Sequence, residues 1–288
     1  MRRTGYIERM REATGPSHDG GRSPSAGATT YMVTAIALAI LFLFPLVWST
    51  FASVRGPGGF GLENYGRLFN DETGIRPRHV INTVVVTALT VGGTLLVATL
   101  GGYAFGRFRF PGRDVLFLIT LAILMVPYAT ILIALYVLLA WVGLEDTLVG
   151  LSLVLIMFQL PFSIFMMRNS FEAIPHEIEE SALVDGCNSL TALVRIMLPA
   201  VRPGLVTVGL FAFLTSWNEY FAPLILISST DNLTLPLAVV KLRIASYGAI
   251  DYSALEAGVT FMAVPCLILF LFLQRSYVRG FMSGALRG

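Results

Sequence analysis

The sequence predicts an all-α polytopic membrane protein with six transmembrane helices. Of its 288 residues, 55% are hydrophobic and only 13% are charged, whereas an average soluble domain has about 25% charged residues. The mean hydropathy is +0.74. A soluble protein of this length could not bury so much apolar surface, so the composition excludes a soluble enzyme and a disordered chain.

Six apolar stretches are long enough to cross a bilayer, which takes about 20 helical residues. They are 31–51, 80–103, a run within 115–144, a run within 147–167, 203–226 interrupted by Glu219, and 257–274. Lipid offers the backbone no hydrogen-bond partners, so each span must be a helix or a strand of a closed barrel. The alternating segments of about ten residues that are typical of barrel strands are not found, which favours helices.

The two ends of the chain indicate its organisation. Residues 1–30 are rich in Gly, Ser, Arg and Pro, and we expect a disordered cytoplasmic tail before a transmembrane domain over 31–288. Basic residues concentrate on the cytoplasmic side of membrane proteins. With the N-terminus inside, all but six of the 20 basic residues face the cytoplasm, the six being Arg55, Arg67, Arg76, Arg78, Lys241 and Arg243. Both termini are therefore predicted to be cytoplasmic.

The longest predicted cytoplasmic loop, 168–202, is much longer than a plain connector needs to be. Pro175 suits the first turn of a helix, and Glu177, Glu179 and Glu180 follow it near the positive end of the helix dipole. Gly186 suits the C-terminal cap of this helix. The first half of the loop is thus predicted to be helical.

A second helix is predicted from Ser189, as the N-cap, to Pro199. Its apolar residues follow helical spacing and form one stripe, made of Leu190, Leu193, Val194 and Met197. An acidic helix followed by an apolar one is expected to dock a partner protein. The alternative is a hairpin on the membrane surface, although such helices usually carry Lys and Arg on their polar face.

The same loop carries a spaced motif: Glu180-Ser181-Ala182, three residues, Gly186, nine residues, and Ile196-Met197-Leu198-Pro199. This motif resembles the EAA loop of binding-protein-dependent ABC importers, with Ser181 replacing the usual alanine. Segments 103–110 and 216–220 are similar to carbohydrate permeases of the maltose type, specifically the shorter, six-span subunit. The resemblance extends over residues 31–288.

The resemblance implies the ABC importer permease fold, with 168–202 as a cytoplasmic coupling loop in a bacterial cell membrane. Site residues implied for coupling to an ATPase are Glu180, Ala182, Asp185, Gly186, Ile196, Leu198 and Pro199. The implied partners are a second homologous permease, a cytoplasmic ATPase dimer, an extracytoplasmic solute-binding protein, membrane lipid and a carbohydrate, without nucleic acid.

The chain itself is not expected to be an enzyme or to hold a cofactor or metal. Its only lysine, Lys241, follows Val240 and not the glycine that a phosphate-binding loop requires. The resemblance places ATP and Mg²⁺ on the separate ATPase.

Glu219 is the one acid inside a predicted span, and such residues are functional candidates. Together with Trp217 and Asn218, it could line a substrate path, because an indole and an amide suit a neutral sugar. A purely structural role for Glu219 is weighed equally with this functional one. Two further functions stay open: an ion-coupled secondary transporter that uses Glu219, and a membrane scaffold without transport activity.

Smaller features complete the prediction. The pairs Gly92-Gly93 and Gly101-Gly102 predict close helix packing. Pro127, Pro161, Pro223 and Pro265 interrupt apolar runs and can kink their helices. Residues 62–69 predict a short surface helix. Residues 228–256 predict a long polar outer segment, which by resemblance approaches the solute-binding protein; the alternative is a surface loop with short interfacial helices.

Overall fold

The computed structural model describes residues 26–56, 59–69, 75–245 and 252–285. Most of the tail predicted over 1–30 lies outside these residues. The chain divides after Trp48 into two compact units. The first contains helix α2 (Ala26–Ser53) up to Trp48, and the second contains the last turn of α2 and all the elements that follow.

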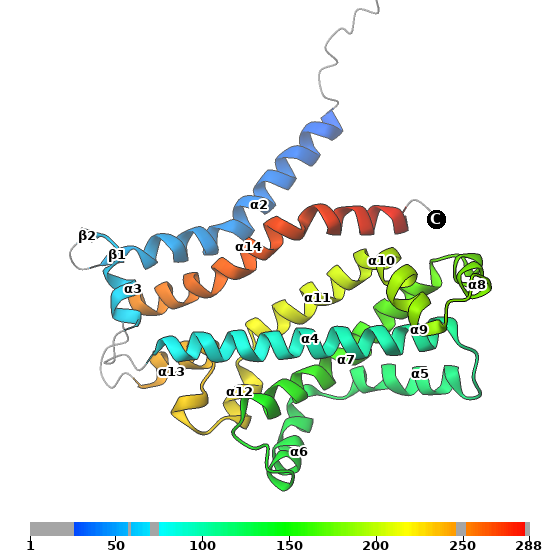
Figure 1. Cartoon of the computed structure of the whole chain (residues 1–288). Coiled ribbons are helices and arrows are strands. Elements are labelled where there is room, and N and C mark those ends of the chain that lie inside the picture. The colour runs from blue at the N-terminus through cyan, green and yellow to red at the C-terminus, as the bar shows by residue number, and fades with distance from the viewer. Residues whose placement is uncertain (1–25, 57–58, 70–74, 246–251, 286–288) are drawn as a thin grey trace, which may run out of the picture. The chain divides into compact units, whose positions relative to one another are not determined.

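The second unit is built from helices (Figure 1). They are α3 (Glu63–Leu68), α4 (Pro77–Arg107), α5 (Arg113–Ala122), α6 (Tyr128–Trp141), α7 (Leu148–Glu172), α8 (His176–Val184), α9 (Ser189–Ala192), α10 (Leu198–Ala200), α11 (Arg202–Trp217), α12 (Phe221–Leu226), α13 (Leu235–Ala245) and α14 (Tyr252–Ala285). Short 3₁₀ turns η2 (Ile123–Met125) and η4 (Thr230–Asn232), a π-helical segment η3 (Leu193–Met197) and an antiparallel strand pair, β1 (Arg55–Gly56) with β2 (Gly59–Phe60), complete the described elements.

The all-α membrane fold predicted from the sequence is confirmed. In the described part of the chain, four helices are long and apolar enough to cross a membrane alone, namely α2, α4, α7 and α14. Two bent helix pairs raise the number to six if each pair forms one span. The short helix predicted over 62–69 is present as α3, with Leu62 and Phe69 as its caps.

The third predicted span is bent at Pro127, one of the prolines expected to kink their helices. The chain bends by 103° between α5–η2 and α6. The break falls at Val126 and Pro127, where Val126 takes an extended conformation (φ −82°, ψ 127°). Proline removes a backbone donor and disfavours helical geometry in the preceding residue, which explains the break.

The fifth predicted span is also interrupted. Helix α11 ends at Trp217 after 16 residues, and α12 starts only at Phe221. At its other end α11 meets α9–α10 with a bend of 79° at Val201. Pro199 therefore does not end the second helix of the loop, because the chain stays helical through Ala200.

Helices α4, α7 and α11 pack along one another and form the centre of the second unit (Figure 1). Glycines on α4 permit this contact, as the paired glycines predicted. A Cβ atom on Gly93 would lie 2.5 Å from Ile156, and one on Gly102 would lie 2.5 Å from the Cβ of Met167. Gly92 differs, because a Cβ atom there would meet no atom of the described chain within 4 Å.

The outer segment predicted over 228–256 contains a short helix, as its alternative expected, but this helix is buried and not at the surface. Helix α13 starts at Leu235, and Leu235, Leu237 and Val239 are buried. Leu235 and Val239 pack in a core that includes Leu68 of α3, whereas Leu237 packs in the core that includes Val86 of α4. Helix α14 comes close enough that a Cβ atom on Gly258 would lie 3.0 Å from Val239. Residues 246–251 lie outside the described part.

Candidate functional site

Helix α8 and the turn after it carry the first half of the predicted coupling motif. Pro175 is the N-cap of α8, one residue before the helical turn in which it was predicted. Two residues of α8 face the chain's own interior, Glu179 and Ala182. Glu180 and Asp185 are exposed. Ala182 therefore packs within this chain, whereas Glu180 is free to meet a partner.

The turn at Gly186 has a defined cause. Its φ of +89° lies in the left-handed region, where only glycine is unstrained. The N–H of Gly186 donates to the Leu183 carbonyl at 3.1 Å, and the N–H of Cys187 donates to the Ala182 carbonyl at 3.0 Å. This pair of bonds closes α8 in a Schellman motif. The C-terminal cap predicted from the sequence is confirmed.

The second helix of the loop differs from its prediction in two details. Asn188, not Ser189, is the N-cap, because its side chain accepts the N–H of Thr191 at 2.8 Å. The predicted single stripe is split: Leu193 and Met197 are buried, while Leu190 and Val194 are exposed. A π-helical turn over Leu193–Met197 widens the helix and changes which residues share a face.

The remaining motif residues lie along this π-helical and α10 segment. Ile196 and Leu198 are half-buried, and Pro199 is exposed. The structure thus separates the motif into residues that hold the loop together and residues that face outward. The residues that face outward include Glu177, the basic Arg195 and Pro199. An acidic and apolar group among them, which we call the outward face, is made of Ile178, Glu180, Leu183, Val184, Asp185, Leu190 and Val194.

Sequence reasoning missed the anchor of α8. The Oε2 atom of Glu179 lies 3.4 Å from Nε of Arg107. The same carboxylate accepts a hydrogen bond from the Tyr103 hydroxyl. Tyr103 and Arg107 lie four residues apart on α4 and so share one helix face. That spacing indicates that the two side chains lie together, but nothing in the sequence shows that they meet an acid more than 70 residues away.

The predicted substrate-path residues lie at the other end of α11. Trp217 is buried, and its Nε1–H donates to the Met262 carbonyl at 3.0 Å. Asn218 is exposed and donates to the Leu214 carbonyl at 2.8 Å. Glu219 accepts the N–H groups of Phe221 and Ala222 at 2.7 and 3.0 Å, and so caps α12. These bonds match the structural alternative for Glu219, and the substrate roles stay predictions.

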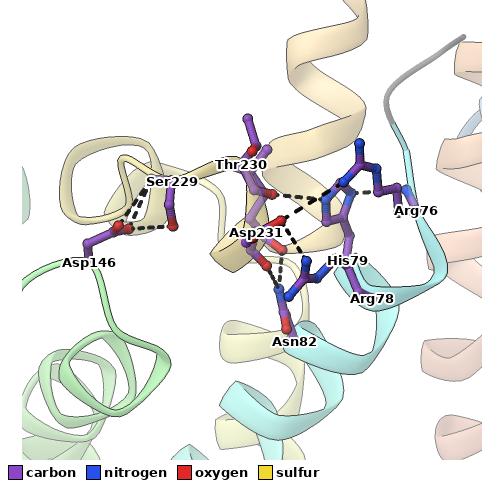
Figure 2. Close-up of polar contacts among 9 residues, drawn as sticks. Arg76, Arg78, His79, Asn82, Asp146, Ser229, Thr230 and Asp231 are labelled. Atoms are coloured by element: carbon purple, nitrogen blue, oxygen red, sulfur yellow. Dashed lines mark hydrogen bonds and ion pairs between the residues drawn. The ribbon is translucent and has the colours of Figure 1, made fainter. Parts of the chain in front are cut away.

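A polar network surrounds the 228–233 segment (Figure 2). Asp146 accepts the N–H groups of Ser228 and Ser229 at 2.9 and 3.1 Å. Asn82 of α4 donates to the carbonyls of Asp231 and Leu233 at 2.8 and 2.9 Å. The segment is therefore held from two sides, by α4 and by the turn before α7.

Helix α4 adds charged contacts to this network. Arg78 bonds the Asp231 carboxylate at 2.6 Å. Nε2 of His79 lies 3.2 Å from the Thr230 carbonyl, while its Nδ1 accepts the N–H of Arg76 at 3.2 Å (Figure 2). Both ring nitrogens of this buried histidine are thus used. The segment between α12 and α13 is a fixed element and not a loose connector.

The family of this chain follows from its similarity to known proteins. Residues 98–283 match the family described as "Binding-protein-dependent transport system inner membrane component". The chain belongs to this family. The match covers α7, the predicted coupling motif on α8–α10 and the spans that follow it.

Individual relatives of this permease agree with the assignment. The Diacetylchitobiose uptake system permease protein DasC of Streptomyces coelicolor is 34% identical over 89% of this chain and 96% of its own length. The Arabinooligosaccharides transport system permease protein AraQ of Halalkalibacterium halodurans is 31% identical over 87% of this chain and 93% of its own length.

Solved structures show the same fold. A bacterial ABC transporter involved in import of the acidic polysaccharide alginate matches with a TM-score of 0.74, 23% identity, and coverage of 88% of this chain and 98% of that one. The bacterial alginate transporter in complex with an alginate pentasaccharide-bound periplasmic protein gives a TM-score of 0.65 at 19% identity. That match covers 86% of this chain and 94% of the other. The predicted family and permease fold are confirmed.

Proposed function

We propose that this permease forms half of the translocation path of an ATP-driven importer, for a carbohydrate delivered by an external solute-binding protein. The observation that carries the proposal is the outward face of the 168–202 loop. Glu180 and Asp185 are exposed there beside apolar side chains such as Val184, which is 87% exposed. An exposed apolar patch with acids beside it is typical of a protein–protein contact.

Under this proposal the outward face docks on a cytoplasmic ATPase dimer, which binds ATP and Mg²⁺. A second homologous permease completes the path, and both termini of this chain are cytoplasmic. Closure of the ATPase dimer moves α8. This movement switches the spans between a state open to the cytoplasm and a state open to the outside of the cell, by a hinge or shear transition. The family membership favours this function over an ion-coupled transporter and over a scaffold.

The names of the relatives support a carbohydrate cargo. They include uptake systems for diacetylchitobiose, arabinooligosaccharides and maltodextrin. We propose a neutral oligosaccharide of this class. Asn218 is the exposed member of the predicted substrate path, and its side chain would face the cargo.

Two measurements test the function. First, the permease should copurify an ATPase from its own cells, and Glu180→Ala should abolish copurification without loss of membrane insertion. Glu172→Ala, an exposed acid at the end of α7, is the matched control.

Second, uptake should depend on ATP and survive an uncoupler. Uptake that collapses with the uncoupler but survives ATP depletion would refute the proposal.

The cargo is tested separately. Uptake into cells is measured with labelled diacetylchitobiose, arabino-oligosaccharide, maltodextrin and alginate oligosaccharide. We expect one of the three neutral sugars to be taken up. Exclusive uptake of the acidic alginate fragment would contradict the neutral class while leaving the importer function intact.

A further inference from the structure

Two neighbouring acids on α8 have opposite surroundings. Glu180 is exposed, whereas Glu179 is 9% exposed and points into the chain. Successive residues of an α-helix point about 100° apart, so one acid can face a partner while the other faces the spans. The motif explains Glu180 and assigns nothing to Glu179.

Arg107 neutralises Glu179 and joins it to the last turn of α4. The Arg107 side chain is 1% exposed, and its Nε lies 3.4 Å from Oε2 of Glu179. Its Nη2 donates to the Ile174 carbonyl at 2.8 Å, and its Nη1 bonds Nδ1 of His176 at 3.0 Å. A buried charge left without its partner is strongly unfavourable, so the pair holds α8 and α4 together.

Tyr103 completes the arrangement one turn earlier on α4. Its hydroxyl donates to Oε1 of Glu179 and lies 3.5 Å from the Ser189 carbonyl at the start of α9. Its ring packs edge-to-face on Phe108 and on Phe171 of α7, with centroids 5.3 and 5.4 Å apart. The ring is thereby fixed, and its hydroxyl has a defined position.

The end of α4 that carries these residues is rigidly attached to α7. A Cβ atom on Gly102 would lie 2.8 Å from the backbone nitrogen of Arg168, and one on Gly106 would lie 3.3 Å from the Arg168 carbonyl oxygen. Helix α8 follows α7 after only three residues, 173–175, and otherwise lies beside the short α9. The side chains of Tyr103, Arg107 and Glu179 add a second link, which joins α8 to the end of α4.

We infer that Tyr103, Arg107 and Glu179 form a clamp that makes α8 move with α4 and α7 as one body. Glu179 is a positioning residue: it does not touch the ATPase, but it transmits the movement that docking at Glu180 begins. This inference rests on the proposed function. Without the clamp, α8 would still bind the ATPase but would shift without moving the spans to the same extent.

The test measures coupling and not only transport. The assembled transporter, with its ATPase and binding protein, is reconstituted in liposomes, and solute uptake and ATP hydrolysis are recorded in the same sample. Glu179→Gln keeps the size of the side chain but removes the charge that neutralises Arg107. We expect it to keep the ATPase bound and to lower uptake per ATP hydrolysed by about fivefold or more.

Tyr103→Phe is a milder second variant, because it removes one hydrogen bond and keeps the ring packing. We expect a smaller fall in uptake per ATP, and we expect the double variant to be no worse than Glu179→Gln, since both act through one cluster. Glu172→Gln is the matched control. It breaks an exposed pair with Arg168, at 2.9 Å, and should leave the ratio unchanged.

Three results would overturn the clamp. One is a normal uptake-to-hydrolysis ratio in both Glu179→Gln and Tyr103→Phe. Another is loss of the ATPase from Glu179→Gln, as expected for Glu180→Ala, which would make Glu179 a docking residue. The third is strict additivity of the two variants. None of these would affect the proposed function, which fails only if uptake by the unchanged protein does not require ATP.

Discussion

At the scale of single residues, neighbouring polar side chains in this permease have different surroundings and different roles. Glu179 is buried against Arg107, and the next residue, Glu180, is exposed. Glu219 caps α12 within the chain. Asp146, which has a left-handed backbone (φ 51°), caps the 228–229 backbone (Figure 2). Aspartate is among the residues that tolerate this conformation, so it serves both the turn and the cap.

Asp146 gives a pH-dependent prediction. Burial raises the pKa of this carboxyl, but the N–H groups of Ser229 and Ser228 and the Ser229 hydroxyl outweigh burial and hold its pKa below the usual value. The folded state therefore favours the charged form. This contribution to stability is complete above the ordinary pKa of aspartate, about 3.9, and is lost as the pH falls through the lowered pKa of the folded state.

We expect Asp146→Asn to lower the free energy of unfolding by about 1 kcal/mol at pH 7. Asparagine also tolerates the left-handed backbone, so the variant tests the charge and not the turn. Thermal unfolding in detergent should show a lower midpoint for the variant at pH 7 and converging midpoints as the pH falls below about 4. Glu145→Gln, a change at the exposed neighbour, is the control. A difference that persisted unchanged at low pH would contradict the assignment.

At the scale of elements, the spans are long continuous helices where glycine permits close contact, and broken helices where proline or a cap intervenes. Helix α4 lies on α7 through Gly102, whereas Pro127 splits the third span and Glu219 caps a new helix within the fifth. Pro161 and Pro265 lie inside the continuous helices α7 and α14. Proline in an apolar run therefore does not by itself predict a break.

Gly102→Ala should weaken the contact between α4 and α7. The new methyl group would lie 2.5 Å from the Cβ of Met167 and 2.9 Å from its carbonyl carbon, and neither atom can move alone. We expect a loss of about 2–3 kcal/mol from overpacking, measured as a lower unfolding midpoint in detergent. Gly92→Ala is the matched control, because its methyl group would meet no described atom within 4 Å. Equal midpoints for the two variants would refute the packing argument.

At the scale of the whole molecule, the chain has one end organised around the 168–202 loop and another around the polar network of Figure 2. Helices α4, α7 and α11 connect these ends within the second unit. The distribution of basic residues predicts that the loop is cytoplasmic and the network external. Under the proposed function, this predicted orientation would let ATP-driven movement on one side act on solute exchange on the other.

Cysteine labelling checks the orientation. In a background with Cys187 and Cys266 replaced by alanine, single cysteines are placed at two exposed positions, Ser181→Cys on α8 and Thr230→Cys in the network. In intact cells, a membrane-impermeant maleimide should label the cysteine at position 230 and leave that at 181 unlabelled. After the cells are opened, both should react. The reverse pattern would invert the topology.

The sequence alone determined the membrane class, the approximate position of each span and the glycine cap of α8. These features depend on local composition and spacing, which physical chemistry relates directly to structure. Gly186 is an example, because its left-handed turn and helix cap follow from one residue and its neighbours.

Only the tertiary structure decided which side of each helix is buried and which distant residues meet. The pairing of Glu179 with Tyr103 and Arg107 joins positions more than 70 residues apart. Leu190 and Val194 of the predicted stripe are exposed, and a π-helical turn runs over Leu193–Met197. Such outcomes depend on packing between elements, since a helix of a membrane protein is apolar on most sides and its hydrophobic pattern does not reveal its neighbours.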